Sequence, residues 1–126
     1  MAREIIATDD APRSPLFSQA VRAGSTIHVS GMVGIDSRTG ELPAGIQDQT
    51  RQAIRNCETV LTAGGSSLDD VTMVTVLIAN PADFAEMNEA YAQTIGEPPP
   101  ARAVARLGPE LPGIRVSITM TAHVED

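Results

Sequence analysis

The sequence of 126 residues contains no lysine, no tryptophan and only one cysteine. Without a lysine amine, the protein cannot hold a carbonyl substrate or pyridoxal phosphate as a Schiff base. The lone Cys57 cannot form a disulfide within the chain, and neither His28 nor His123 has a cysteine pair near it. These absences argue against Schiff-base chemistry and against a zinc site.

Basic side chains and aromatic rings are scarce as well. Nine basic and sixteen acidic residues give a net charge of −7, and only Phe17, Phe84 and Tyr91 are aromatic. Such a charge repels phosphate backbones and three rings offer little base stacking, so nucleic acid is a disfavoured partner. No apolar run approaches the roughly 20 residues of a membrane span, and no basic, apolar leader is visible. We expect a soluble, cytoplasmic protein without a membrane partner.

Hydrophobic periodicity predicts one α/β domain over residues 1–126. Strands are expected at 4–7, 26–33, 71–79, 101–107 and 115–124, and helices at 46–63 and 80–95. This order predicts a single mixed sheet with both helices packed on one face. The run 71–79 is apolar at odd and even positions alike, so we expect a central strand that is buried on both faces.

Cap residues mark the ends of the two expected helices. Gly64 and Gly65 are expected to end the first helix as a left-handed cap. Asn80 is placed to cap the second helix, with Pro81 at its first helical position.

Two helices cover only one face of the sheet, so the other face needs water or a partner. Alternation in the strand 26–33 predicts one face made of Ile27, Val29, Gly31 and Val33, and a second made of His28, Ser30 and Met32. In the last strand, one face is polar and contains Arg115, Ser117, Thr119, Thr121 and His123. The polar residues of that strand fit either water or a wet interface between subunits.

No self-contained catalytic motif is visible, and Arg102 stands out among the candidates. It follows three consecutive prolines at the start of an apolar strand, and its planar donors suit a carboxylate. A solvent-facing arginine on an edge strand is the plainer alternative. Ser30 precedes Gly31, where a missing side chain lets a ligand approach the backbone; alternatively, the hydroxyl bonds to a neighbouring strand.

Three further polar residues are weaker candidates. Asn88 is expected near the apolar stripe of the second helix, which is an unusual place for an amide. A satisfied buried amide or a half-exposed one explains it equally well. His28 and His123 lie on polar strand faces, where a histidine is more often structural or exposed than catalytic.

Four segments, taken in order, carry a resemblance to a known family: Ser30-Gly31, Thr39-Gly40-Glu41, Asp83 to Asn88, and Pro100-Ala101-Arg102. Over about residues 5–124 the chain resembles the RidA/YjgF family of imine deaminases. The resemblance implies a chorismate-mutase-like fold and a homotrimer whose ligand clefts lie between subunits. It also implies hydrolysis of enamines and imines, such as 2-aminoacrylate and its imine, to a 2-oxo acid and ammonia, with no metal and no organic cofactor.

The resemblance assigns a role to each matching residue. Arg102 would bind the carboxylate of the substrate, which makes a small carboxylate or imine the expected partner. Ser30 and the Gly31 backbone would line the cleft near the amine. Asn88 would support the site.

Three positions depart from the pattern of the family. Phe17 stands where a tyrosine is typical, which keeps the ring and removes a hydroxyl. Val104 replaces a cysteine whose backbone carbonyl contacts the attacking water, and Val104 still supplies that carbonyl. Ser117 occupies the position of a glutamate that activates this water, and a serine is a poor general base at neutral pH. We therefore expect weaker deaminase activity than in members with the glutamate.

The missing glutamate leaves other functions open. The protein is alternatively a trimer that binds small carboxylate metabolites through Arg102 without catalysis, or a family member specialised for another imine step. Cleavage of RNA, which has been associated with the family, fits the net charge of −7 least.

Overall fold

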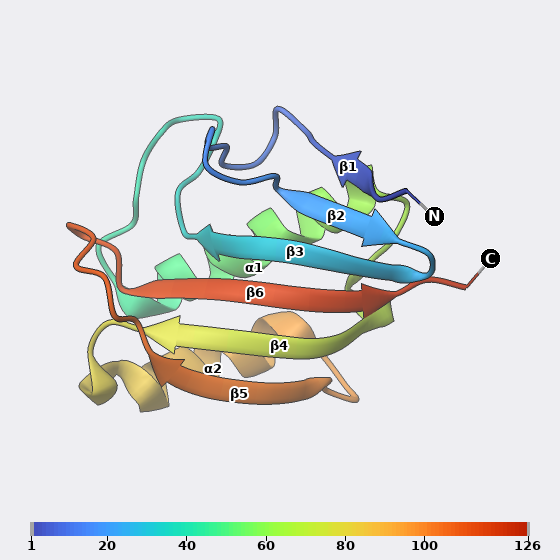
Figure 1. Cartoon of the computed structure of the whole chain (residues 1–126). Coiled ribbons are helices and arrows are strands. Elements are labelled where there is room, and N and C mark those ends of the chain that lie inside the picture. The colour runs from blue at the N-terminus through green and yellow to red at the C-terminus, as the bar shows by residue number, and fades with distance from the viewer. Residues whose placement is uncertain (1, 126) are drawn as a thin grey trace.

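The computed structural model describes residues 2–125 and contains a six-stranded sheet with two α-helices on one of its faces (Figure 1). The strands are β1 (Glu4–Ile6), β2 (Ala20–Ala23), β3 (Thr26–Val33), β4 (Val71–Ile78), β5 (Ala101–Arg106) and β6 (Val116–His123). The helices are α1 (Ile46–Ala63) and α2 (Phe84–Ile95). The order in the sheet is β1-β2-β3-β6-β4-β5; β4 and β5 are parallel and the other neighbours antiparallel. The predicted mixed sheet with both helices on one face is confirmed.

Helix α1 spans the residues that the sequence predicts and buries its apolar stripe against the sheet. The fully buried members of the stripe are Ala53, Ile54, Cys57, Val60 and Leu61. Burial raises the pKa of the Cys57 thiol, so the cysteine is protonated and unreactive. The left-handed residue at the end of the helix is Gly65, with φ +80°, whereas Gly64 has φ −91°. None of the helices formed by residues 2–125 combines the length and apolar character needed to cross a membrane.

The start of the second helix differs from the expectation in one respect. The Asn80 side chain accepts a hydrogen bond from the Ala82 N–H at 3.0 Å, as expected of a cap. It caps a short 3₁₀ turn at Pro81–Asp83, however, and the α-helix begins only at Phe84. The four-residue strand β2 was not predicted at all, because so short a segment shows no clear alternation.

The expected alternation in β3 is wrong beyond Val29, because the pairing of β3 with β6 shifts register between Val29 and Met32. Such a bulge adds a residue and inverts the faces that follow it. Met32 is therefore buried with Ile27 and Val29, whereas Gly31 is exposed. The bulge places Ser30 and Gly31 together on the side of the sheet that carries no helix.

Strand β4 is not buried on both faces, contrary to the expectation. Val74 and Val76 are fully buried beneath the helices, whereas Thr75 and Leu77 are only half-buried on the opposite side. The reason is that both helices lie on one face and leave the other without a covering layer (Figure 1). We call this helix-free side the open face.

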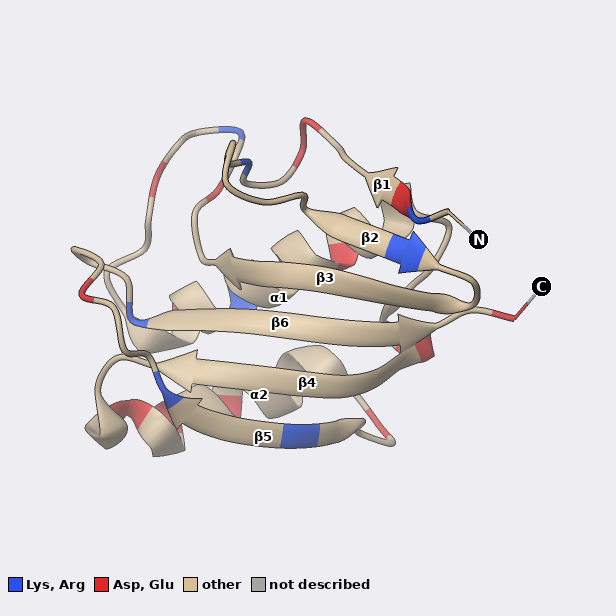
Figure 2. Ribbon diagram, viewed as in Figure 1, with Lys and Arg blue, Asp and Glu red and all other residues tan. Residues whose placement is uncertain are grey.

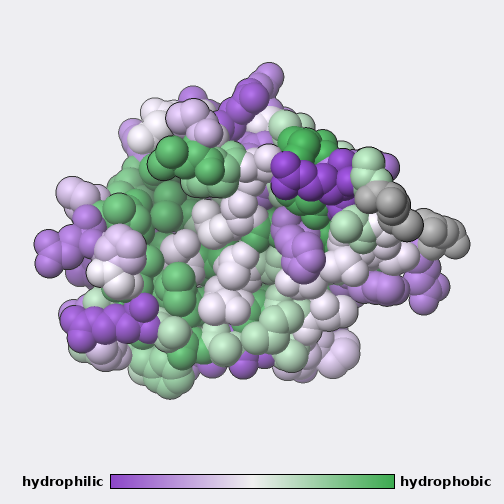
Figure 3. All heavy atoms as spheres, viewed as in Figure 1, coloured by the Kyte–Doolittle hydropathy of each residue, from purple (hydrophilic) through white to green (hydrophobic). Residues whose placement is uncertain are grey.

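The open face lacks charge. Strands β3, β4 and β6, which form its centre, contain no Asp, Glu, Lys or Arg (Figure 2). In space-filling view the middle of this face is mostly neutral to hydrophobic, and the hydrophilic side chains lie mainly around its rim (Figure 3). A broad uncharged surface of this kind is typical of an interaction site.

Candidate functional site

Arg102 lies on β5, the strand at one edge of the sheet, with its side chain toward the helices. In the parallel register it pairs with Val74, whose side chain is buried beneath them. One guanidinium nitrogen, Nη1, donates to Oδ1 of Asn88 on α2 at 2.8 Å. The Cζ atom lies 4.8 Å from the centroid of the Tyr91 ring. Arg102 is exposed on an edge strand, as the plainer alternative supposed, but two contacts with α2 orient it.

Tyr91 forms the surface under this guanidinium. Its side chain is only 6% exposed, and within residues 2–125 its buried hydroxyl has no hydrogen-bond partner. Burial raises the pKa of that hydroxyl, and the positive charge of Arg102 lowers it by less, so the phenol is neutral at neutral pH. The sequence places Tyr91 among the few aromatics and on the apolar stripe of the second helix, but not among the candidate site residues. The missed signal is its spacing of three residues from Asn88, which puts both on one helix face.

A cavity of about 380 Å³ opens beside these three residues. Its wall is formed by Asn88, Tyr91, Ala92 and Ile95 of α2, by Arg102, and by the loop residues Gly96, Glu97, Pro99 and Pro100. The volume falls within the range of about 300–1,000 Å³ that small-molecule sites occupy. A cation held at the rim of a largely apolar cavity is suited to binding an organic carboxylate.

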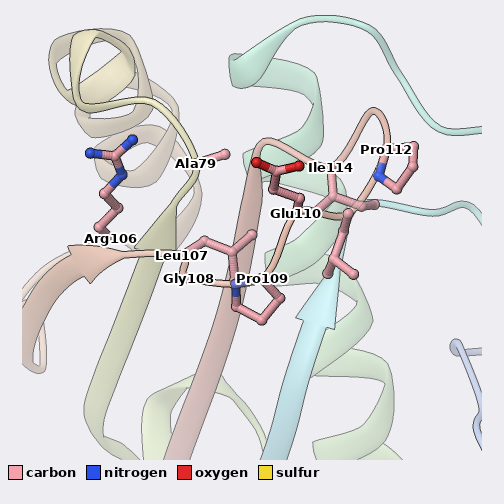
Figure 4. A pocket seen from close by; sticks show the side chains of 9 residues that line it. Ala79, Arg106, Leu107, Gly108, Pro109, Glu110, Pro112 and Ile114 are labelled. Atoms are coloured by element: carbon pink, nitrogen blue, oxygen red, sulfur yellow. The ribbon is translucent and has the colours of Figure 1, made fainter.

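A larger hollow of about 600 Å³ lies at the opposite end of β5 (Figure 4). It is lined by Ala79, Arg106, Ile114 and the loop residues 107–112. Figure 4 shows the Arg106 side chain projecting from the end of β5 and the Glu110 side chain projecting from the loop that follows this strand. None of the candidate residues from the sequence lines this hollow, and we therefore place the site at Arg102 rather than in the larger cavity.

Ser30 and Phe17 are linked through the chain between them. The Ser30 hydroxyl donates to the Ser18 carbonyl at 2.5 Å, and the Ser30 N–H donates to the Gln19 carbonyl at 2.9 Å. Phe17, which directly precedes this segment, is 45% exposed. The hydroxyl thus makes the structural bond that the plainer alternative supposed, yet its oxygen still has lone pairs for an N–H donor.

Ser117 on β6 lies directly beside Gly31 on the open face. A Cβ atom at position 31 would lie 2.8 Å from the Ser117 Oγ atom, so any larger residue there would force the Ser117 hydroxyl to move. Ser117 is half-buried and pairs with Val33 across the strands. No acidic residue belongs to the three strands around it. The position therefore offers a hydroxyl but no carboxylate to a bound water.

Val104 lies on β5, two residues beyond Arg102, and its half-buried side chain packs against the core. The Leu107 N–H donates to the Ile78 carbonyl, so the backbone polar groups of Leu107 point toward β4. Because successive residues of a strand point their backbone groups in opposite directions, the Val104 carbonyl points to the unpaired edge. Within residues 2–125 no strand pairs with that edge, so the carbonyl can accept a hydrogen bond there.

The sequence candidates thus form two groups that one chain does not bring together. Arg102, Asn88 and Val104 lie at the β5 edge, while Phe17, Ser30, Gly31 and Ser117 lie around the end of β3. Strands β6 and β4 separate β3 from β5, which at about 4.8 Å per strand spacing amounts to roughly 14 Å. Within residues 2–125, no three His, Cys, Asp or Glu side chains are grouped so as to bind a metal ion.

Comparison with known proteins gives consistent matches over nearly the whole chain. The family model described as endoribonuclease L-PSP matches residues 8–124. The 2-iminobutanoate/2-iminopropanoate deaminase of Mus musculus is 37% identical over 122 residues, which cover 95% of this chain and 90% of that protein. Both are similarities of the full domain rather than of a single motif.

Solved structures agree with these sequence matches. The crystal structure of RidA from an Antarctic Psychrobacter superposes with a TM-score of 0.89 at 35% identity, covering 96% of this chain and 99% of that one. Escherichia coli TdcF, crystallised with bound serine, has a TM-score of 0.89 at 32% identity, covering 97% and 99% of the two chains. With this similarity of fold and the family match over residues 8–124, the chain belongs to the RidA/YjgF family.

Proposed function

We propose that this protein hydrolyses reactive 2-imino acids, and the enamines that tautomerise to them, to 2-oxo acids and ammonia. The observation that carries the proposal is the Arg102 guanidinium, which Asn88 and Tyr91 orient at the rim of an apolar cavity. The identity of 37% with a mouse enzyme named as an iminobutanoate deaminase supports the same reaction class.

Different residues bind the carboxylate end and the imine end of the substrate. The guanidinium of Arg102 binds the carboxylate and fixes the orientation of the adjacent imine carbon. The Ser30 oxygen, whose own proton goes to the Ser18 carbonyl, accepts a hydrogen bond from the imine N–H. The Val104 carbonyl and the Ser117 hydroxyl hold the attacking water.

The reaction itself is a hydrolysis with no change in overall oxidation state. The water oxygen bonds to the imine carbon while the nitrogen gains a proton, which gives a tetrahedral carbinolamine. The carbon–nitrogen bond then breaks, ammonia leaves, and loss of the hydroxyl proton forms the keto group. Because Ser117 is no general base at neutral pH, water addition relies on positioning, and turnover is slow relative to family members with a glutamate there.

We propose further that the protein acts as a homotrimer with its clefts between subunits. Two observations support this assembly: the Arg102 and Ser30 groups lie roughly 14 Å apart in one chain, and the open face carries no charge on its central strands. A second copy whose β5 edge meets this face completes the site.

Binding without catalysis is the second candidate function, and Ser117 is the specific observation in its favour. The site retains the carboxylate-binding arginine but has no carboxylate on β3, β4 or β6 to activate water. The related TdcF binds serine in its crystal structure. A role in another imine step of a biosynthetic route would use the same residues.

An imine-trapping assay, read together with thermal protection, separates catalysis from binding alone. Imines are generated by an amino-acid oxidase in the presence of semicarbazide, and the enzyme competes with the trapping reagent. Loss of semicarbazone with the wild type, and its recovery with Arg102→Ala, is the result expected of the deaminase. Thermal protection by 2-oxo acids without any loss of semicarbazone would instead indicate binding alone.

A further inference from the structure

We infer that a hollow between helix α1 and two loops binds a small zwitterion, a molecule with both a carboxylate and an ammonium group, such as a free amino acid. This polar hollow has a volume of about 440 Å³. It is lined by four residues of α1 and by four residues of the loops, namely Gln52, Arg55, Asn56 and Thr59, and Asp10, Asp36, Ser37 and Arg38.

The polar hollow lies apart from the proposed deaminase site and the proposed interface. None of the residues that line it belongs to a strand of the sheet. Helix α1, which forms one wall, lies on the side of the sheet opposite the open face (Figure 1). Binding in the polar hollow is therefore independent of imine chemistry and does not require a second copy of the chain.

Two buried amide side chains hold the loops of the polar hollow in place. Asn56 is 2% exposed, and its Nδ2 atom donates to two backbone carbonyls, at 2.8 and 2.9 Å, just before the loop residues 36–38. Gln19 is 4% exposed, and its Nε2 atom donates to three backbone carbonyls on both sides of Asp10, each at 3.0 Å. Walls that are fixed in this way lose little conformational entropy when a ligand binds.

Four charged side chains line the polar hollow, and two of them already pair with one another. The Asp36 carboxylate accepts a hydrogen bond from the Arg38 N–H at 2.9 Å, and the Arg38 Nε atom lies 3.6 Å from the same oxygen. The hydrogen bond from this N–H lowers the pKa of Asp36, so its carboxylate is ionised at neutral pH. In contrast, the Arg55 guanidinium and the Asp10 carboxylate have no hydrogen bond or ion pair with any of residues 2–125. One positive and one negative group are thus left for a ligand.

Uncharged polar groups of the wall add hydrogen-bond acceptors for an ammonium group. Gln52 donates through Nε2 to the Asn56 Oδ1 atom at 3.0 Å, which leaves its own Oε1 atom to accept. The Thr59 hydroxyl donates to the Arg55 carbonyl at 2.9 Å, and its oxygen still has a lone pair to accept with. The buried Ser37 hydroxyl has no hydrogen-bond partner within residues 2–125. The wall therefore holds polar groups that the fold itself does not use.

The balance of charge favours a zwitterion over a simple ion. A phosphate or carboxylate alone would meet Arg55 but would also approach the carboxylates of Asp10 and Asp36, and a simple cation would approach two guanidinium groups. A zwitterion instead pairs its carboxylate with Arg55 and its ammonium with Asp10, which places each charge beside the opposite one. The volume of about 440 Å³ is within the range of about 300–1,000 Å³ of small-molecule sites, so an α-amino acid is accommodated.

Titration of the isotope-labelled protein with L-alanine, followed by two-dimensional NMR, tests the inference. We expect saturable shifts of the backbone amide signals of Asp10, of residues 36–38 and of residues 52–59. Shifts confined to residues 88–102 would place the amino acid at the Arg102 cavity instead and would overturn the inference. The absence of any saturable shift would overturn it as well.

Substitutions of the two unpaired charged residues test their roles. Arg55→Ala and Asp10→Asn should each weaken the binding of L-alanine by about tenfold or more, because each removes a charged hydrogen-bonding partner. Both side chains are exposed, so we expect both variants to fold. Unchanged affinity in either variant would contradict the pairing of the ligand with that residue.

Arg51→Ala is the matched control. Arg51 lies one turn before Arg55 on α1, does not line the polar hollow, and already donates to Asp48 and Gln93. We expect this variant to bind L-alanine as the wild type does. A loss of affinity equal to that of Arg55→Ala would show that the effect is one of surface charge in general, and would overturn the site.

Two analogues of L-alanine test the class of ligand. L-lactate has a hydroxyl in place of the ammonium group, and L-alaninamide has an uncharged amide in place of the carboxylate. We expect each to bind about tenfold or more weakly than L-alanine, because each lacks one charged contact. Lactate that binds as tightly as alanine would indicate an anion site, and alaninamide that does so would indicate a cation site. Either result would overturn the assignment of a zwitterion.

Discussion

The Cζ atom of Arg102 lies 4.8 Å from the centroid of the Tyr91 ring, and the Tyr91 hydroxyl is buried without a hydrogen-bond partner within residues 2–125. The ring attracts the guanidinium through its π face, a contact worth about 0.5–2 kcal/mol. The hydroxyl contributes nothing to that contact. The two parts of one side chain therefore have opposite effects on stability.

Tyr91→Phe and Tyr91→Leu should separate these effects. Phenylalanine keeps the ring and removes an unsatisfied buried hydroxyl, whose burial costs about 1–3 kcal/mol. We expect Tyr91→Phe to raise the melting temperature in calorimetry and to keep kcat/KM close to that of the wild type. Leucine removes the ring, so Tyr91→Leu should raise KM for the imine. A loss of activity in Tyr91→Phe as large as in Tyr91→Leu would refute the assignment of the ring as the positioning element.

The hydrogen bond between Asn88 and Arg102 should appear as a KM effect. Asn88→Ala removes a bond of 2.8 Å to a charged group, and such bonds contribute about 1.5–3 kcal/mol. We expect KM to rise about tenfold, because the guanidinium loses its fixed orientation. Asn88→Asp should be worse still, since its carboxylate competes with the substrate for Arg102. Steady-state kinetics in which Asn88→Asp binds substrate better than Asn88→Ala would show that this bond has another role.

Ser117→Glu should increase turnover, because it supplies the general base that the open face lacks. General-base catalysis contributes roughly 10²–10⁴-fold in favourable geometry, and a gain of about tenfold in kcat is a modest expectation. Ser117→Gln is the control, since glutamine has the same size and no basicity. A glutamate variant that is no faster than the glutamine variant in the semicarbazide assay would contradict this role of position 117.

A charge placed on the open face should dissociate the assembly. Thr75 is half-buried at the centre of this face, paired with Thr119 on one side and Ala103 on the other. Thr75→Arg would bury an unpaired charge in the interface, which costs several kcal/mol. We expect sedimentation to show a trimer for the wild type and a monomer for Thr75→Arg. Thr62→Arg on the exposed side of α1 should remain a trimer, and a monomeric wild type at micromolar concentration would contradict the assembly.

Hydrophobic periodicity was sufficient to predict the long helices and strands and the fold class. The predicted helix 46–63 coincides with α1, because an amphipathic stripe of five turns is a strong local signal. The bulge at Ser30-Gly31 could not be predicted from alternation, since it depends on the pairing of β3 with β6. The half-buried face of β4 could not be predicted either. An apolar composition does not distinguish a buried face from one that awaits a partner.

The candidate site could be predicted only in part, for a similar reason. The resemblance named Arg102 and Asn88, and the structure places them in contact. Tyr91 was missed because its role depends on its contact with Arg102 of β5; its spacing from Asn88 shows only that the two residues share a helix face. The contact between Gly31 and Ser117 joins residues on different strands. Only folding brings such pairs together.

Hydrolysis of imines that depends on Arg102 is the most direct test of the central claim. The wild type, Arg102→Ala and Arg106→Ala are compared with oxidase-generated imines and semicarbazide trapping. Arg106 is the matched control, because it is exposed on the same strand and on the same side, four residues away, and does not line the cavity. We predict accelerated hydrolysis by the wild type and by Arg106→Ala, and a loss of about a hundredfold in kcat/KM for Arg102→Ala. No acceleration by the wild type, or equal activity in Arg102→Ala, would contradict the account.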